Sequence, residues 1–201
     1  WAKLARYDQK NKEVVIDQNK DRVVFMGNSI TEGWKNKMPD MFDNQTFINR
    51  GISGQTSPQM LVRFRSDVIE LKPNVVVILA GTNDIAGNTP LKDLETVTGN
   101  LASMAELARH HEIKVILCSV LPASNYPWRP KKNPHTQIPI LNELIKDYAE
   151  KEGFYYLDYF SSMTDGKNGL KENYGNDGVH PNITGYRVMR KMVLKAIDKI
   201  L

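Results

Sequence analysis

The stretch Asn74-Val-Val-Val-Ile-Leu-Ala80 is the strongest indication of the fold, because every residue from Val75 to Ala80 is apolar. In a half-exposed strand, apolar and polar residues would alternate. Such a run is typical of a strand that is covered on both faces in a parallel sheet. Comparable short segments lie on both sides of it. We expect strands at Arg22–Gly27, Thr46–Gly51, Asn74–Ala80, Ile113–Val120 and Phe154–Asp158.

Helical patterns follow these strands. Apolar residues recur at helical spacing in three segments, which predict helices over Leu94–His111, Pro139–Glu152 and Ile183–Leu201. Strands that alternate with helices indicate a three-layer α/β/α domain around a parallel sheet. Since 201 residues is the size of one compact domain, we expect residues 1–201 to form a single domain with one functional site.

The composition narrows the class of partner. The 27 Lys and Arg and the 23 Asp and Glu give a net charge of +4, and the basic residues are scattered along the chain. Without a basic motif interleaved with aromatic residues, we expect a solvated surface and no nucleic-acid partner. No apolar stretch approaches the length of a membrane span, so none is expected.

The compartment stays open. Cys118 is the single cysteine and lies in an apolar run, where we expect it to be a buried core residue. The absence of an internal disulfide fits either an oxidising or a reducing compartment. The numbered chain begins at Trp1 instead of Met, so a secreted or periplasmic protein that has lost its signal and a cytoplasmic protein are both expected possibilities.

A proline-rich segment interrupts the pattern between residues 121 and 139. Its prolines predict an ordered loop, since they suit neither a helix interior nor a central strand. Ligands of open α/β sheets bind at the carboxyl ends of the strands, where this loop must lie. Tyr126, Trp128 and Arg129 are therefore candidate substrate-binding residues, and a loop whose aromatic rings only cover the core is an equal alternative.

A serine follows the first strand directly. The sequence Gly27-Asn28-Ser29-Ile-Thr-Glu32 places its hydroxyl at the carboxyl end of that strand, where a nucleophile would face a ligand. The same residues also match a helix capping box, in which Ser29 would only satisfy a backbone N–H group. Taken alone, the pattern favours the cap.

An aspartate and a histidine precede the last predicted helix in Asp177-Gly-Val-His180. A serine hydroxyl needs a general base, and that base needs a group that fixes its tautomer. One tight turn can present both, with Asp177 oriented toward His180 and His180 toward Ser29. A lone histidine in this position is more often structural, and we assign the remaining histidines to structural or exposed positions: His110, His111 and His135.

Two further turns offer hydrogen-bond donors. Gly54 lies after the second predicted strand and Asn83 after the third. Acyl transfer develops negative charge on a carbonyl oxygen, and preorganised N–H donors stabilise it. The backbone N–H groups of Ser29 and Gly54 and the side-chain amide of Asn83 are the expected oxyanion donors. Taken alone, each position favours a structural explanation, with Gly54 as a residue of positive φ and Asn83 as part of an Asx turn.

Together these motifs resemble the SGNH hydrolases, also called GDSL esterases and lipases. The similarity runs from Val23 to Tyr186, and its four blocks are Gly27-Asn-Ser29, Gly51-Ile-Ser-Gly54, Gly81-Thr-Asn-Asp84 and Asp177-Gly-Val-His180. The resemblance implies a flavodoxin-like five-stranded α/β/α sandwich. It also implies that the four residues after which the family is named are Ser29, Gly54, Asn83 and His180.

One residue departs from the family pattern. Asn28 stands where the family usually has aspartate, so the turn should persist while the local charge differs. The segment from Val24 to Trp34 looks especially like the branch that contains platelet-activating-factor acetylhydrolase catalytic subunits and bacterial carbohydrate acetylesterases. No metal-ligand spacing or phosphate-binding glycine motif is visible, so no metal or cofactor is expected.

The resulting interpretation is a serine esterase that removes short acyl groups, above all acetyl, from a small-molecule or glycan ester. The alternatives are a lipid or phospholipid acylhydrolase and a catalytically silent SGNH-like module that binds glycans. The oligomeric state is left undetermined by the sequence.

Overall fold

The computed structural model describes residues 1–17, 19–43, 46–90 and 92–201. Its centre is a five-stranded sheet in the order β2-β1-β3-β4-β5, and all four strand pairs are parallel. This confirms the expected α/β fold. The strands are β1 (Val23–Gly27), β2 (Phe47–Gly51), β3 (Val75–Leu79), β4 (Lys114–Cys118) and β5 (Tyr155–Leu157).

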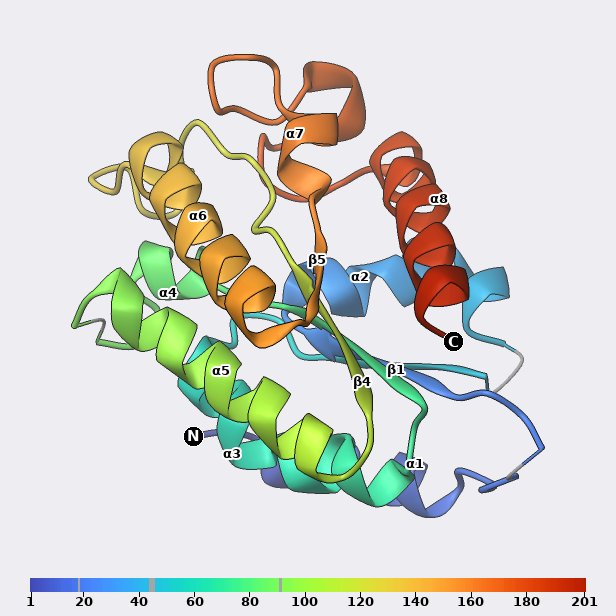
Figure 1. Ribbon diagram of the computed structural model, residues 1–201. Helices are drawn as coiled ribbons and strands as arrows, with labels where there is room; N and C mark the ends of the chain where they lie inside the picture. The colour runs from blue at the N-terminus through green and yellow to red at the C-terminus, as the bar shows by residue number, and fades with distance from the viewer. Residues whose placement is uncertain (18, 44–45, 91) are drawn as a thin grey trace.

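Helices cover both faces of the sheet (Figure 1). Buried side chains of α3, α4, α5 and α6 pack on one face, and those of α2, α7 and α8 pack on the other. The helices are α1 (Asp8–Lys12), α2 (Ser29–Lys37), α3 (Ser57–Asp67), α4 (Thr82–Ala86), α5 (Leu94–His110), α6 (Pro134–Glu152), α7 (Tyr159–Met163) and α8 (Ile183–Ile200). Short 3-10 helices lie at Leu4–Arg6, Pro39–Met41, Ile69–Leu71 and Glu172–Tyr174.

The strand β3 shows why its sequence has no polar alternation. Val76 and Ile78 belong to the core beneath α3, α5 and α6, whereas Val75 and Val77 belong to the core beneath α2 and α8. Successive side chains of a strand point to opposite faces, so a strand between two helical layers is apolar at every position. Cys118 is buried at the end of β4, and this burial raises the pKa of its thiol, as befits a core residue.

The start of α6 corrects one expectation. The sequence predicts an ordered loop up to residue 139 and a helix from Pro139, but the helix begins at Pro134 and contains Pro139. Pro134 lies in the first turn, where a missing N–H group costs nothing. Pro139 cannot donate to the carbonyl of His135, and that carbonyl instead accepts a hydrogen bond of 3.0 Å from Asn168 Nδ2. A partner from a distant loop thus replaces the lost helical bond.

The sheet order places three loops side by side. β1 lies between β2 and β3, and Gly27 at its carboxyl end pairs with Gly51 of β2 and Leu79 of β3. The loops that follow these strands therefore start level with one another, at the edge where doubly wound sheets bind ligands.

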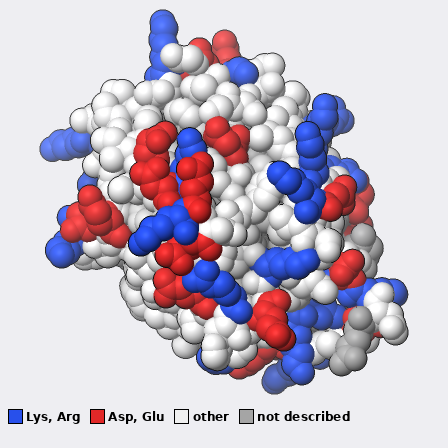
Figure 2. Space-filling model, viewed as in Figure 1, with Lys and Arg blue, Asp and Glu red and all other residues white. Residues whose placement is uncertain are grey.

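Charged side chains of both signs are intermixed on the face of the molecule shown in Figure 2. That face carries no broad basic patch of the kind that binds a polyanion. In the part of the chain that the structure describes, none of the helices has the length and apolar character needed to cross a membrane.

Candidate active site

Ser29 is the first residue of α2, and it does not cap that helix. Asn28 is the N-cap, and its Oδ1 accepts a hydrogen bond of 3.0 Å from the N–H group of Ile30. The cap therefore uses the oxygen that asparagine shares with aspartate, and the turn persists without the charge. Gly27 allows the strand to approach the helix closely, since a Cβ there would lie 2.0 Å from Thr31 Oγ1. The hydroxyl of Ser29 is left free for another partner.

That partner is His180. Ser29 Oγ lies 3.0 Å from His180 Nε2, although the two residues are far apart in the sequence. His180 Nδ1 lies 2.7 Å from Asp177 Oδ2. Because an ionised carboxylate only accepts hydrogen bonds, Nδ1 carries the proton and Nε2 accepts from the serine hydroxyl. The structure thus brings the three predicted residues together in one hydrogen-bonded chain.

Asp177 is held by its own turn. Its Oδ1 accepts hydrogen bonds from the backbone N–H groups of Val179 at 2.9 Å and His180 at 2.7 Å, and Gly178 supplies the positive φ of 75° that the turn requires. Partial burial acts to raise the pKa of Asp177, but the hydrogen bonds from His180 and Val179 outweigh it and lower that pKa. Asp177 therefore stays ionised at neutral pH and fixes the tautomer of His180.

The two loops beside Ser29 are linked to each other. Gly54 has a positive φ of 81°, and its carbonyl accepts a hydrogen bond of 3.0 Å from Asn88 Nδ2. Asn83, in the first turn of α4, donates from Nδ2 to the carbonyl of Gln55 at 2.9 Å. The amide of Asn83 has a second N–H group, which this bond leaves available. The predicted donor positions thus lie on neighbouring loops joined by hydrogen bonds.

The proline-rich loop reaches this site through Trp128. The Trp128 ring lies 5.7 Å from the His180 ring, measured between centroids, and stacks on Tyr126 at 5.3 Å. Trp128 is 40% exposed, whereas Tyr126 is fully buried and shares a hydrogen bond of 2.8 Å with Thr82 Oγ1. Tyr126 therefore has no surface to offer a ligand and supports Trp128 from below. Arg129 is exposed on the same loop.

Comparison with family models shows which protein family the chain belongs to. The model of the GDSL-like lipase/acylhydrolase family matches residues 25–188, which include all four sequence blocks. The chain belongs to this family. The resemblance seen in the sequence is thereby confirmed, and family membership places the chain among carboxylic ester hydrolases.

Several relatives share its fold or sequence. A GDSL-like lipase from Bacteroides thetaiotaomicron, known from a crystal structure, shares 46% sequence identity with this chain. The two structures superpose with a TM-score of 0.96, and the match covers 100% of this chain and 99% of that one. An acetylxylan esterase of Xylanibacter ruminicola is 29% identical over 88% of this chain, but the match spans only 43% of that protein's length. An esterase of Pseudomonas aeruginosa is 29% identical over 88% of this chain and 83% of its own.

Glu32 has a role that the sequence did not indicate. In this GDSL-like chain, Oε2 of Glu32 accepts two hydrogen bonds from Ser53. One comes from the backbone N–H group of Ser53 at 2.9 Å and the other from its hydroxyl. Its Oε1 accepts a hydrogen bond of 3.0 Å from Arg6. Burial acts to raise the pKa of Glu32, but the bonds from Ser53 and Arg6 outweigh it and lower that pKa. Glu32 thus joins the helix of Ser29 to the loop of Gly54.

Asp84, the last residue of the third sequence block, is a buried carboxyl whose nearest donors are neutral. It accepts from the N–H group of Ser57 at 2.9 Å and from the Ser57 hydroxyl at 2.6 Å. Burial is the larger influence and raises the pKa of Asp84 to about 6. At pH values between about 4 and 6, Asp84 therefore holds a proton in the folded chain, whereas the same carboxyl in the unfolded chain has released it.

This raised pKa gives a pH dependence of stability with a defined sign. A carboxyl that binds its proton more tightly when folded makes the free energy of unfolding fall as pH rises. Between pH 4 and 7 the wild type should therefore lose up to about 3 kcal/mol relative to Asp84→Asn, which cannot titrate at this position. Urea unfolding of both proteins across this range measures the difference, and pH profiles that stay parallel would contradict the assignment.

Proposed function

We propose that this chain is a serine esterase that removes acetyl and other short acyl groups from carbohydrate esters. The chain of contacts from Ser29 Oγ through His180 to Asp177 is the observation that supports it most strongly. In this proposal Ser29 is the nucleophile, His180 the general base and Asp177 the group that orients and stabilises the imidazolium.

Acylation begins when Ser29 Oγ attacks the ester carbonyl carbon while His180 Nε2 accepts the hydroxyl proton. The carbonyl oxygen becomes an oxyanion, for which the N–H groups of Ser29 and Gly54 and the amide of Asn83 are the proposed donors. The C–O bond to the alcohol then breaks, and His180 returns the proton to the departing alkoxide oxygen. The acyl group stays on Ser29 as an ester.

Deacylation repeats these steps with water. His180 takes a proton from a water molecule, whose oxygen attacks the acyl carbon and again produces an oxyanion on the donors. The bond to Ser29 Oγ breaks, His180 protonates the serine, and the carboxylic acid leaves. Across the two stages one ester and one water molecule are consumed, and one alcohol and one carboxylic acid are released.

The surroundings of His180 support a carbohydrate as the alcohol part of the ester. The side chains of His180 and Asp177 are 38% and 44% exposed, so the reacting groups lie at an open surface that a chain of sugars can approach. Trp128 offers a half-exposed ring next to His180, and aromatic faces stack on the apolar side of sugar rings. The acetylxylan esterase relative from Xylanibacter ruminicola points in the same direction.

The role of Trp128 is tested by Trp128→Ala. Loss of a stacking ring worth roughly 1.4 kcal/mol should raise KM for an acetylated xylo-oligosaccharide about tenfold. Hydrolysis of nitrophenyl acetate should change little, because its small leaving group does not need the ring. Trp1→Ala removes another exposed tryptophan and is the matched control. Equal losses on both substrates would show that Trp128 acts on His180 rather than on a sugar.

The acyl preference separates the proposal from its main alternative. Initial rates on nitrophenyl acetate, butyrate and octanoate should fall as the acyl chain lengthens. Rates that rise toward octanoate would favour a lipid or phospholipid acylhydrolase. Binding of the oligosaccharide without any turnover that depends on Ser29 would favour a silent glycan-binding module.

A further inference from the structure

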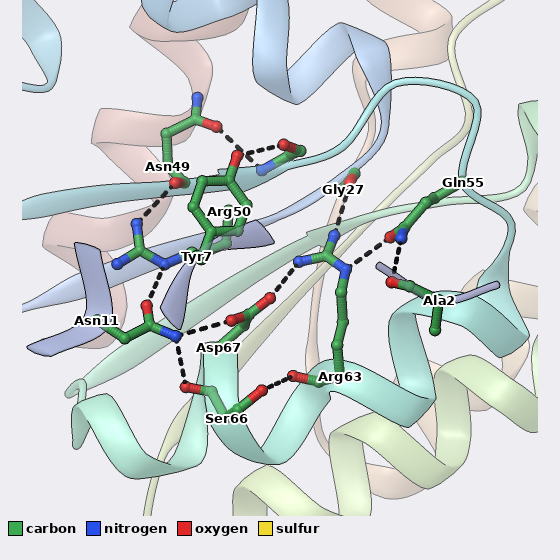
Figure 3. Close-up of polar contacts among 11 residues, drawn as sticks. Ala2, Tyr7, Asn11, Gly27, Asn49, Arg50, Gln55, Arg63, Ser66 and Asp67 are labelled. Carbon is green, nitrogen blue, oxygen red and sulfur yellow. Dashed lines mark hydrogen bonds and ion pairs between the residues drawn. The ribbon is translucent and has the colours of Figure 1, made fainter. Parts of the chain in front are cut away.

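A fully buried arginine lies behind the candidate active site. Arg63 is on α3, and its side chain is 0% exposed. Its guanidinium donates from Nε to Gln55 Oε1 at 2.6 Å, from Nη1 to Asp67 Oδ2 at 2.8 Å and from Nη2 to the carbonyl of Gly27 at 3.1 Å (Figure 3). Each nitrogen of the guanidinium therefore has a partner inside the protein.

Two of these partners belong to the loops that carry the proposed catalytic groups. Gly27 ends β1, two residues before Ser29, and Gln55 directly follows Gly54. The carbonyl of Gln55 is also the acceptor for Asn83 Nδ2 at 2.9 Å. Arg63 therefore bonds directly to Gly27 and Gln55, and the carbonyl of Gln55 extends this connection to Asn83 on the third loop.

The N-terminal segment holds the same cluster from the other side. The carbonyl of Ala2 accepts from Gln55 Nε2 at 2.7 Å, and Asn11 donates to Asp67 Oδ1 at 2.8 Å (Figure 3). Gln55 and Asp67 are thereby fixed in the orientations in which they receive Arg63. The planar guanidinium, with its fixed fork of donors, can span such a set of acceptors, whereas the single ammonium of lysine cannot.

Stability alone does not explain a charge in this place. Burial lowers the pKa of Arg63, which reflects the cost of removing a cation from water even beside Asp67. A buried ion pair commonly stabilises a fold no better than apolar side chains of similar volume. The bonds from Arg63 to Gly27 and Gln55 do something that apolar packing cannot, because they tie α3 in a fixed direction to two other segments of the chain.

We infer that Arg63 is a positioning residue that keeps the N–H group of Gly54 and the amide of Asn83 aimed at the oxyanion. The inference rests on the proposed esterase function. Oxyanion donors act through preorganised geometry, and a displacement of about 1 Å lowers a rate by roughly 100-fold. Arg63 touches no substrate, so its effect should be confined to the transition state.

The test compares Arg63→Met with Arg65→Met, which changes an exposed arginine on the same helix. For Arg63→Met we expect kcat per titrated active site on nitrophenyl acetate to fall about 100-fold while KM stays within about twofold. Phenylboronic acid adds to a serine hydroxyl as a tetrahedral anion, so its inhibition constant should rise by a similar factor. Arg65→Met should behave as wild type in each assay.

A second variant guards against loss of folding. In Arg63→Met/Asp67→Leu both buried charges are removed together, so no unpaired carboxylate remains in the core. This variant should show the same fall in kcat and in boronate affinity, whatever its thermal stability. A lower melting temperature with wild-type kcat and boronate affinity in both variants would overturn the positioning role. A wild type without turnover that depends on Ser29 would overturn the proposed function and this inference with it.

Discussion

Replacement of Ser29 by alanine should lower kcat for nitrophenyl acetate by about a million-fold, to the background of the assay. The variant loses the oxygen that forms the acyl-enzyme. Among the described residues, no other hydroxyl forms a hydrogen bond with His180 Nε2 and could replace it. The fold should be unaffected, because the cap of α2 is provided by Asn28. Initial-rate kinetics and a thermal unfolding curve of the same preparation check both statements.

Ser162→Ala is the matched control for this variant, because Ser162 is an exposed serine on α7 outside the site. It should hydrolyse the ester at the wild-type rate. Residual turnover by Ser29→Ala within tenfold of wild type would show that another group is the nucleophile, even if that variant remains fully folded.

Changes to the base and its partner should have graded effects. His180→Ala should lose about as much kcat as Ser29→Ala, and the double variant should lose no more, because the two groups act in one step. Asp177→Asn should lose about ten-thousand-fold, since an amide at that position permits the wrong imidazole tautomer. Steady-state kinetics of the three single variants and the double variant measure this order.

If the losses in kcat of the two single variants added up in the double variant, Ser29 and His180 would act independently of each other. A wild-type rate in Asp177→Asn would mean that the contact of 2.7 Å between Asp177 Oδ2 and His180 Nδ1 does not control the tautomer. Asp165→Asn, a change to an exposed aspartate that forms its own turn in a loop, provides the comparison for a charge removed elsewhere.

Much of the fold could be predicted because the signals were local. Each predicted strand overlaps one of the five in the structure. The signal was clearest in the middle of the sheet, where burial on both faces demands continuous apolar runs such as Val75–Leu79. The start of α6 was wrong for the opposite reason. Only a distant residue, Asn168, satisfies the carbonyl that Pro139 leaves without a donor, and no local pattern reveals such a partner.

The residues of the candidate site likewise fall into those that local motifs revealed and those that they did not. Ser29, Asp177 and His180 lie in short motifs at the ends of predicted elements, so their meeting could be anticipated from the order of strands and helices. Arg63 and Asp67 were missed, because a pair four residues apart on a helix looks like a surface ion pair. Their spacing of three residues from the apolar Met60 and Phe64, respectively, places all four side chains on one helical face, and this was the available sign of burial.

Trp128 shows the limit of an even choice made from sequence. The sequence left open whether this loop forms a wall of the substrate site or only covers the core. In the structure Tyr126 is buried and covers the core, whereas Trp128 is half-exposed beside His180, and its contact with substrate stays a prediction. The stacking of the two rings depends on how the proline-rich loop folds back over the sheet, which composition alone does not fix.

The proposed mechanism depends on an acyl-enzyme at Ser29, and a fluorophosphonate probe reports on the reactivity of this serine. The probe forms a stable phosphonyl ester with an activated serine, so the intact wild-type chain should gain one adduct, and peptide mass mapping should place that adduct on Ser29. Ser29→Ala should gain none. An adduct on another residue, or one that persists in Ser29→Ala, would show that Ser29 is not the nucleophile.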